Sequence, residues 1–524
     1  MAKVLEPRGP KAWRGAPHAD AKGNGNGHAP AKAHALQPGA ALRPGPAVAP
    51  LVRRLCEELR REGVSYCQFK SNWRLERWLG GEGDLDLLVE RADAGRFAAA
   101  LYRLGFKQAR PTADRVVPGV CDYYGFDEEA RRFIHLHVHH QLVLGHDLTK
   151  NFRLPLERAY LASASRDGLI PVPSAEFELI LFVLRMVLKY SPAESAFARL
   201  FRRGAAGRAV REELEFLEGR ARREEVERLL SEHLPFVGVR FFDDCLDTLR
   251  GEGPAWRRWA LRRELERRLR AHARRTRAAD ALAKTCRRVK RLVLERAPGR
   301  HARKRLAAGG SLVALVGGDG AGKTTALEGL DRWLSKKFVV RRFHLGKPPR
   351  SLLTLAVIVA LRVRDRLPGM KPGAGEFPGY LRLVRWALAS RDRRKVYERA
   401  RRFATNGGIA LCDRFPVSRL RLMDGPNIAR FVGPRRAGRL ARLLLEVEER
   451  NYRHISEPDV LFVLRVEPEV AVRRKTNEGE EHVRARSREL WEQDWTGTRA
   501  HVVDAGRPAD EVLAHMQTVL WESL

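Results

Sequence analysis

The stretch LVALVGGDGAGKTT, residues 312–325, joins an apolar run to a glycine-rich loop. Residues 317–324 fit the pattern GxxxxGK followed by Ser or Thr, which is typical of a loop that holds nucleotide phosphates between a strand and a helix. Glycines are needed because the backbone must curl around the phosphates with its N–H groups inward, a path that a Cβ would obstruct. The helix amino terminus adds partial positive charge. The stretch therefore predicts a P-loop nucleotide site.

Individual residues of this loop have distinct expected roles. Lys323 is expected to bridge the β and γ phosphate oxygens of the donor, and the Thr324 hydroxyl to ligate Mg²⁺. ATP and Mg²⁺ are therefore the predicted cofactors. The other candidate nucleotide-binding residues of the loop are Gly317, Asp319, Gly320, Gly322 and Thr325.

From residue 309 onward, short β-branched runs alternate with helical segments, which predicts an α/β fold with a parallel sheet. The expected strands are 312–316, 339–344, 409–412, 460–466 and 501–503. Ligands gather at the carboxyl ends of such strands. Asp413 follows the third run, so we expect it to be a metal ligand and catalytic residue. Arg414 beside it has the geometry to hold a phosphoryl group bidentately and is a second catalytic candidate.

These residues, with two later segments, resemble the nucleoside-monophosphate kinase family, thymidylate kinase in particular. The similar segments are GGDGAGKTT (317–325), DRFPVS (413–418), PDVLFVLRVEPEVAVRR (458–474) and VDAGRP (503–508). The resemblance spans residues 312–512. It implies an ATP-dependent phosphotransferase with a three-layer P-loop fold, in which Arg507 belongs to the turn on the adenine side.

The same resemblance implies that residues 473–488 form a mobile lid over the phosphates. Lid closure excludes water and brings positive charge to the phosphoryl group in flight. Arg484 and Arg486 are the catalytic candidates, and Arg473 and Arg474 also lie in this segment.

The acceptor side departs from the thymidylate kinase pattern. HLGKPP (344–349) stands where that family has an acidic or Arg-Glu-Pro segment, and RLRL (419–422) replaces its Tyr-Gln pair. We therefore expect that dTMP is not the preferred acceptor, and the sequence does not identify the small molecule that is.

A second chemistry-bearing segment lies near the other end of the chain. GDLDLLV (83–89) places Asp84 and Asp86 at i and i+2, on one face of a strand, a spacing that lets both hold metal ions for attack on a nucleotide α-phosphate. With the turn FKSN (69–72) and the strand HLHVHHQL (135–142), it resembles the nucleotidyltransferase superfamily, an α+β fold. The third carboxylate of that pattern would fall at His137, which is not an acid. Nucleotidyl transfer and a catalytically silent binding domain both stay open.

Composition divides the 524-residue chain into five segments. The first is rich in Ala, Gly, Pro, Lys and His and is expected to be disordered, because it has too few large apolar residues to form a core. The expected segments are a tail at 1–48, a nucleotidyltransferase-like domain at 49–161, a helical region at 162–253, a basic helical connector at 254–306 and a P-loop kinase domain at 307–524.

The charge of +35 favours polyanionic partners. The connector contributes roughly twenty Lys and Arg residues against four acids. A solvated helix between domains and a patch for nucleic acid or a lipid surface both explain it. The alternative function is therefore a nucleotide-switched protein that binds nucleic acid or another polyanion, and a homodimer is also open.

The sequence also bears on the compartment. The six cysteines form no CxxC pair, no run reaches the roughly 18 to 20 apolar residues of a membrane span, and no secretory signal is visible. We therefore expect a cytoplasmic protein.

Overall fold

The computed structural model describes residues 48–112, 115–189, 205–251, 255–295, 303–366, 377–420, 422–423, 425–432, 438–475 and 479–524. All but the last residue of the predicted disordered tail lie outside these ranges. The chain separates into two compact units, each described by itself below. The first comprises Met1–Lys107 with Ala113–Arg300, and the second comprises Gln108–Thr112 with His301–Leu524. Both units combine helices with a sheet, so the α/β class is confirmed.

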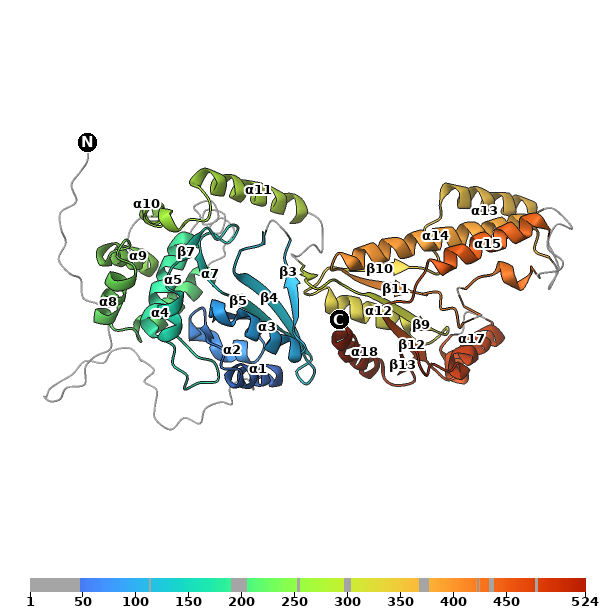
Figure 1. Cartoon of the computed structure of the whole chain (residues 1–524), viewed down its shortest axis with the longest axis horizontal. Helices are drawn as coiled ribbons and strands as arrows, with labels where there is room; N and C mark the ends of the chain where they lie inside the picture. Colours follow the sequence, from blue (N-terminus) through green and yellow to red (C-terminus); the bar gives the residue numbers. More distant parts are fainter. Residues whose placement is uncertain are drawn as a thin grey trace, which may run out of the picture. The chain divides into compact units, whose positions relative to one another are not determined.

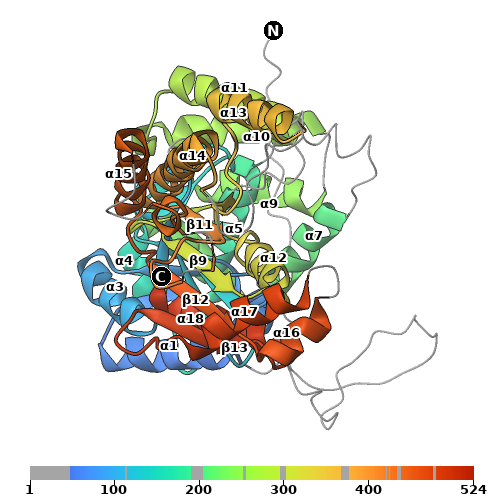
Figure 2. The ribbon, with the colours of Figure 1, turned by 90° about the vertical axis from the view of Figure 1, so that its right-hand side faces the viewer.

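The second unit is built on a five-stranded sheet in which all neighbouring strands are parallel, as predicted. In spatial order the strands are β10 (Val340–His344), β11 (Ile409–Asp413), β9 (Leu312–Gly317), β12 (Val460–Arg465) and β13 (Ala500–Asp504). Figure 2 looks toward this unit and shows β11, β9 and β12 following one another across the sheet. Because β9 lies between β11 and β12, the glycine-rich loop that follows β9 lies beside the carboxyl ends of both neighbouring strands.

Helices cover both faces of this sheet. In a right-handed crossover, the face on which the connecting helix lies depends on the direction in which the chain moves across the sheet. The chain moves in opposite directions from β9 to β10 and from β10 to β11, so the helix after β9 and the helix before β11 lie on opposite faces. The helices are α12 (Lys323–Leu334), α13 (Leu352–Arg364), α14 (Tyr380–Thr405), α15 (Arg439–Arg453), α16 (Pro468–Arg474), α17 (Glu480–Glu492) and α18 (Ala509–Ser523), with the 3₁₀ turn η5 (Ile428–Arg430). Helices α13, α14 and α15 pack together, and α12 packs on α18 (Figure 1).

The first unit contains a mixed four-stranded array in the order β1-β2-β5-β4. Its strands are β1 (Tyr66–Gln68), β2 (Asp84–Val89), β5 (Arg132–His139) and β4 (Val120–Asp127). Strand β2 runs parallel to β5 and antiparallel to β1, and β4 is antiparallel to β5. The odd-numbered β2 residues from Leu85 to Val89 pack against α1 (Pro50–Arg61) and α3 (Ala94–Arg103). Because side chains alternate along a strand, the carboxylates of Asp84 and Asp86 point to the opposite face.

Short elements complete this part of the first unit. Strand β8 and the residues of β3 from Gln108 onward belong to the second unit. Residues Ala109 and Arg110 of β3 pair with Leu306 and Arg305 of β8. These elements are η1 (Asn72–Arg74), α2 (Leu75–Leu79), η2 (Arg91–Asp93), β3 (Lys107–Arg110), β6 (Leu142–Leu144), β7 (Phe152–Leu154), α4 (Glu157–Ala162) and β8 (Arg305–Leu306).

The predicted helical region packs around α5 (Ala175–Lys189), which is buried on nearly every side. The helices around it are α7 (Ala205–Glu218), α8 (Arg223–His233), α9 (Val239–Arg250) and α10 (Ala255–Arg268). Their apolar core also contains Phe69 and Leu88, from the face of the sheet that carries Asp86. The carboxylate face is therefore bordered by this helical bundle.

Much of the predicted basic connector belongs to that bundle. Leu265 and Leu269 are buried in its core, and α10 is followed by η4 (Arg270–His272) and α11 (Arg277–Glu295). Several of its cations are already paired with carboxylates. These pairs are Arg257–Asp244, Arg262–Glu266, Arg267–Glu264, Arg268–Glu264 and Lys284–Asp280. The pairing lowers the charge that this segment presents to a polyanion.

Helix length sets a limit on membrane insertion. Within the described ranges, no helix is both long enough and apolar enough to cross a bilayer. The six cysteines are all free thiols.

Candidate functional site

The glycine-rich loop occupies the turn between β9 and α12, as the sequence predicts. Gly320 has φ of +82°, and a Cβ there would lie 2.7 Å from the Ala471 carbonyl oxygen. Gly322, the residue before α12, has φ of +76°. L-residues rarely adopt such angles, so the path of this loop depends on glycine. The loop therefore presents its backbone and the amino end of α12 at the carboxyl edge of the sheet.

Lys323 folds back over this loop. Its Nζ donates to the carbonyl oxygens of Gly317 at 2.9 Å and Gly318 at 2.6 Å. Burial lowers the pKa of Lys323, while the carboxylates of Asp319 and Asp413 act in the opposite direction. Lys323 thus lies within electrostatic reach of both predicted acidic residues.

Asp319 forms ion pairs with two arginines. Its Oδ2 accepts a hydrogen bond from Arg486 at 2.7 Å, and its Oδ1 lies 3.7 Å from the Arg414 guanidinium. Burial alone would raise the pKa of Asp319, but Arg486, Lys323 and Arg414 outweigh it, so the pKa is lowered. Arg486 comes from α17, 167 residues away in sequence. This hydrogen bond connects α17 to the glycine-rich loop.

Asp413 ends β11, beside β9, where the sequence places it. It is in register with Leu315 of β9, and its Oδ2 lies 3.5 Å from His344 Nδ1 of β10. Arg414 has φ of +53°, a left-handed conformation that costs a non-glycine residue roughly 1 kcal/mol. Such strain at a sheet edge is typical of functional turns. This backbone angle directs the chain from the strand end toward Asp319.

The residues present fit a magnesium ion. Thr324 and Thr325 are exposed on the first turn of α12, and the Asp413 carboxylate is partly exposed at the end of the adjacent strand. A hydroxyl and a carboxylate are hard oxygen ligands of the kind that Mg²⁺ prefers. Thr324 and Asp413 are therefore the residues that would hold it.

A cavity of about 430 Å³ opens beside the first turn of α12. Thr325 and Arg507 line it, together with residues 505–509 and Val512. Arg474 donates to the carbonyl oxygens of Ala505 at 2.8 Å and Gly506 at 3.4 Å, which fixes this turn. The volume falls within the range of small-molecule pockets. The turn that resembles an adenine-side segment therefore borders a cavity next to the phosphate loop.

The two catalytic lid candidates lie in different places. Arg484 pairs with Glu469 at 2.9 Å, a partner outside the cluster around Asp319, whereas Arg486 binds Asp319. The segment between α16 and α17 includes residues 476–478, which lie outside the described ranges. Of these two candidates, Arg486 is the one that contacts a residue of the glycine-rich loop.

We expect Arg486→Ala to lower kcat about tenfold or more, because it removes a cation placed where phosphoryl charge develops. Arg484→Ala is expected to lower kcat by less than about threefold, because a partly exposed ion pair contributes little. Steady-state rates at saturating ATP would measure both, with Arg488→Ala on the same helix as a control for loss of surface charge. Equal losses in the Arg484 and Arg486 variants would contradict this assignment.

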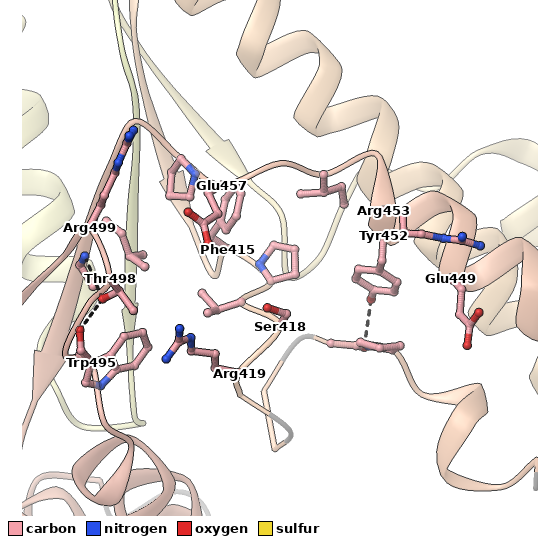
Figure 3. A pocket seen from close by; sticks show the side chains of 18 residues that line it. Phe415, Ser418, Arg419, Glu449, Tyr452, Arg453, Glu457, Trp495, Thr498 and Arg499 are labelled. Carbon is pink, nitrogen blue, oxygen red and sulfur yellow. Dashed lines mark hydrogen bonds between the residues drawn. The ribbon is translucent and has the colours of Figure 1, made fainter.

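A larger cavity of about 520 Å³ lies on the sheet face reached by residues 415–419, which follow Arg414. Figure 3 shows Trp495 and Arg419 on one side of it and Tyr452 on the other, with Ser418 between them. The cavity reaches Leu461 and Ala500, at the amino ends of β12 and β13, and its lining includes none of the residues clustered around Asp319. No local pattern in the sequence indicates this cavity, because its lining residues are spread along the chain between Phe415 and Ala500.

In the first unit, Asp84 and Asp86 share one sheet face with three histidines of β5. Asp84 is in register with His135 and Asp86 with His137. His135 Nδ1 lies 2.6 Å from Asp84 Oδ1, and His137 Nδ1 lies 2.9 Å from Asp86 Oδ1. Asp86 Oδ2 also accepts from Lys70 at 2.7 Å. The two carboxylates are therefore engaged with imidazoles and an ammonium group, which does not fit a shared pair of Mg²⁺ ions.

A third carboxylate exists, on a strand that the sequence did not single out. Asp122 of β4 is buried, and its Oδ1 lies 2.9 Å from His135 Nε2. Because β4 is antiparallel to β5, Asp122 faces His137 in register. The available signal was Asp122 itself, an aspartate that interrupts a run of mostly apolar and aromatic residues in β4.

In the turn at 69–72, where the resemblance to nucleotidyltransferases implies a phosphate, the hydrogen-bond partners are glutamates. Ser71 Oγ donates to Glu213 at 2.5 Å, and the Asn72 N–H donates to Glu178 at 2.9 Å. Burial raises the pKa of Glu178 to about 8. These two acceptors come from α7 and α5, in the helical region that the sequence linked to no chemistry. Hydrogen-bond donors that a phosphate would use are thus already satisfied.

No family model matches the chain. The uncharacterized ATP-binding protein YghR of Escherichia coli (strain K12) is 25% identical over 218 residues, which cover 39% of this chain and 85% of that protein. The same protein from E. coli O6:H1 (strain CFT073) matches with equal identity and coverage.

Proposed function

We propose that the second unit is an ATP- and Mg²⁺-dependent phosphotransferase that resembles the nucleoside-monophosphate kinases. One observation carries the proposal: Lys323, Asp319, Asp413, Arg414 and Arg486, from separate parts of the sequence, meet at the glycine-rich loop. The similarity to YghR, a protein named as ATP-binding, supports nucleotide as the ligand.

The residues have separable roles in phosphoryl transfer. Backbone N–H groups of the loop and Lys323 bind the donor phosphates, and the ammonium group would leave the carbonyls of Gly317 and Gly318 for phosphate oxygens. Arg414 and Arg486 neutralise the charge that spreads over the transferred group. Mg²⁺, held by Thr324 and Asp413, would supply further charge neutralisation. The cavity beside Thr325 and Arg507 receives the base and ribose.

The acceptor is a small molecule that the cavity beside residues 415–419 suits best. Trp495 and Tyr452 offer ring faces, and Arg419 offers a cation for an anionic group. A small molecule with a ring and a phosphate or carboxylate fits this combination. The altered segments 344–349 and 419–422 argue against thymidine as that ring.

A screen of phosphoryl acceptors with the full chain and ATP tests this function. We expect at least one acceptor of that class to give a rate above ATP hydrolysis alone, and dTMP to be a poor one. The rate should fall about 100-fold in Asp413→Asn, whereas phosphorylation by a contaminating enzyme would be unaffected by this substitution. Efficient phosphorylation of dTMP at micromolar concentration would contradict the altered acceptor side.

Nucleotidyl transfer by the first unit stays a prediction. The sheet face carries Asp84, Asp86 and Asp122, which favours phosphate chemistry, but Glu178 and Glu213 hold the donors of the turn at 70–72. Incorporation of labelled nucleotide into protein or nucleic acid would test it directly.

A further inference from the structure

Three atoms converge on the polar face of the first unit. Asp86 Oδ1 lies 2.9 Å from His137 Nδ1, His139 Nε2 lies 3.1 Å from His137 Nδ1, and His139 Nε2 lies 3.9 Å from Asp86 Oδ1. Ligands bound to one metal ion at about 2.1 Å lie roughly 3 to 3.5 Å apart when they occupy adjacent positions. These separations therefore match a cluster that needs little movement to surround an ion.

Hydrogen bonds alone satisfy this cluster poorly. His137 Nδ1 carries at most one proton, yet it faces both the Asp86 oxygen and the His139 nitrogen. That proton must be shared between two acceptors, or else the nitrogen must turn its lone pair toward a carboxylate. A cation among the three atoms would use all three lone pairs at once.

The surroundings hold these side chains in place. His139 is fully buried and stacks on Phe69, with ring centroids 4.0 Å apart and an interplanar angle of 15°. Its second ring nitrogen, Nδ1, has no hydrogen-bond partner among the described residues. Lys70 binds Asp86 Oδ2 and leaves Oδ1 directed at the histidines. Carboxylates that ligate metals are usually held by a further hydrogen bond of this kind.

The charges on this face tolerate a divalent ion. Lys70 and Lys150 bring two positive charges near Asp86, and Lys150 also interacts with Asp122. Asp84, Asp86 and Asp122 bring three negative charges. With neutral imidazoles these groups have a net charge of minus one. A divalent ion would change the net charge to plus one, so it would not add to an existing excess of positive charge.

We propose that Asp86, His137 and His139 bind one divalent transition-metal ion of the Zn²⁺ class, rather than the Mg²⁺ pair implied by the Asp84 and Asp86 spacing. Two imidazole nitrogens and one carboxylate oxygen select Zn²⁺, Co²⁺ or Fe²⁺ over Mg²⁺, which prefers oxygen alone. Asp84 is engaged by His135 and is not a ligand. Three protein ligands leave a coordination position open for water or a substrate oxygen.

Cobalt titration of tag-free, chelator-treated full-length protein tests this site. We expect one Co²⁺ per chain with the visible absorption of nitrogen-ligated cobalt, displaced by Zn²⁺. Asp86→Asn, His137→Gln and His139→Gln should each weaken binding about tenfold or more. His140→Gln is the matched control, because its Nδ1 faces the Val89 carbonyl and it should bind like the unaltered chain. His137, with a side chain 20% exposed, is the ligand whose replacement least disturbs the fold.

Two further variants separate the proposal from its rivals. Asp84→Asn should weaken Co²⁺ binding less than any of the three ligand variants, and Lys323→Ala should leave it unchanged. Thermal unfolding would confirm that each variant is folded. Absence of a bound Co²⁺, equal affinity in His137→Gln and His140→Gln, or Mn²⁺ binding that requires Asp84 but not the histidines would each overturn the proposal.

Discussion

Replacing Lys323 by alanine is expected to lower ATP turnover by about 100-fold or more, because the ammonium group is the cation closest to the phosphate-binding loop. The variant should still fold, since the hydrogen bonds described for Lys323 Nζ go to two carbonyls of its own loop and tie it to no other element. Steady-state rates with the acceptor found in the screen would measure the loss.

The control for this substitution is Lys336→Ala, because Lys336 is exposed just beyond the end of α12. It removes the same charge from the same region and should retain the unaltered rate within about twofold. Similar losses in the two variants, or full activity in Lys323→Ala with an unchanged unfolding temperature, would show that the loop does not bind the donor phosphates.

Asp413→Asn is expected to have the second large effect, a fall in turnover of about 100-fold accompanied by a higher Mg²⁺ requirement. The amide keeps the shape of the carboxylate but loses the negative charge that would hold the ion, so the defect should shrink as Mg²⁺ is raised. Rates measured across a series of Mg²⁺ concentrations would detect this. His344, 3.5 Å away, is the only partner of the Asp413 carboxylate that needs to adjust among the described contacts.

Asp331→Asn provides the comparison, since Asp331 lies on α12 and interacts with Ser335 and Arg342 away from the loop. Its Mg²⁺ dependence should match that of the unaltered chain. If Asp413→Asn kept the same Mg²⁺ dependence and the same rate, Asp413 would not be the metal ligand.

Much of the second unit was predictable from local sequence. The loop at 317–324 and the strand at 312–316 were predictable because their residue types have few alternatives: glycines for positive φ and apolar residues for a buried strand. The parallel sheet followed from alternating strands and helices, and the position of Asp413 followed from the rule that ligands gather at carboxyl ends. The predicted parallel sheet is confirmed.

Long-range pairings were not predictable in the same way. Arg484 and Arg486 look equivalent in sequence, and only the orientation of α17 brings Arg486 to Asp319 and Arg484 to Glu469. Asp122 reaches the histidines of β5 because two antiparallel strands happen to share that register. Register and helix orientation depend on tertiary packing, which a single sequence does not display.

The helical region shows a related gap. Glu178 lies in a nearly all-buried helix, and sequence reasoning linked it to no chemistry. Its contact with the Asn72 N–H, 106 residues earlier, places a carboxylate where the resemblance to nucleotidyltransferases implies a phosphate. The available signal was a glutamate within a mostly apolar stretch of helix, and the contact with Asn72 explains its presence there.

Calorimetric titration of the full chain with ATP, with and without Mg²⁺, tests the central claim most directly. The account predicts one ATP per chain with a Kd between about 1 μM and 1 mM, tightened by Mg²⁺ and lost in Lys323→Ala. A chain that takes up no nucleotide at millimolar ATP and Mg²⁺, or that binds it equally well without Lys323, would contradict it.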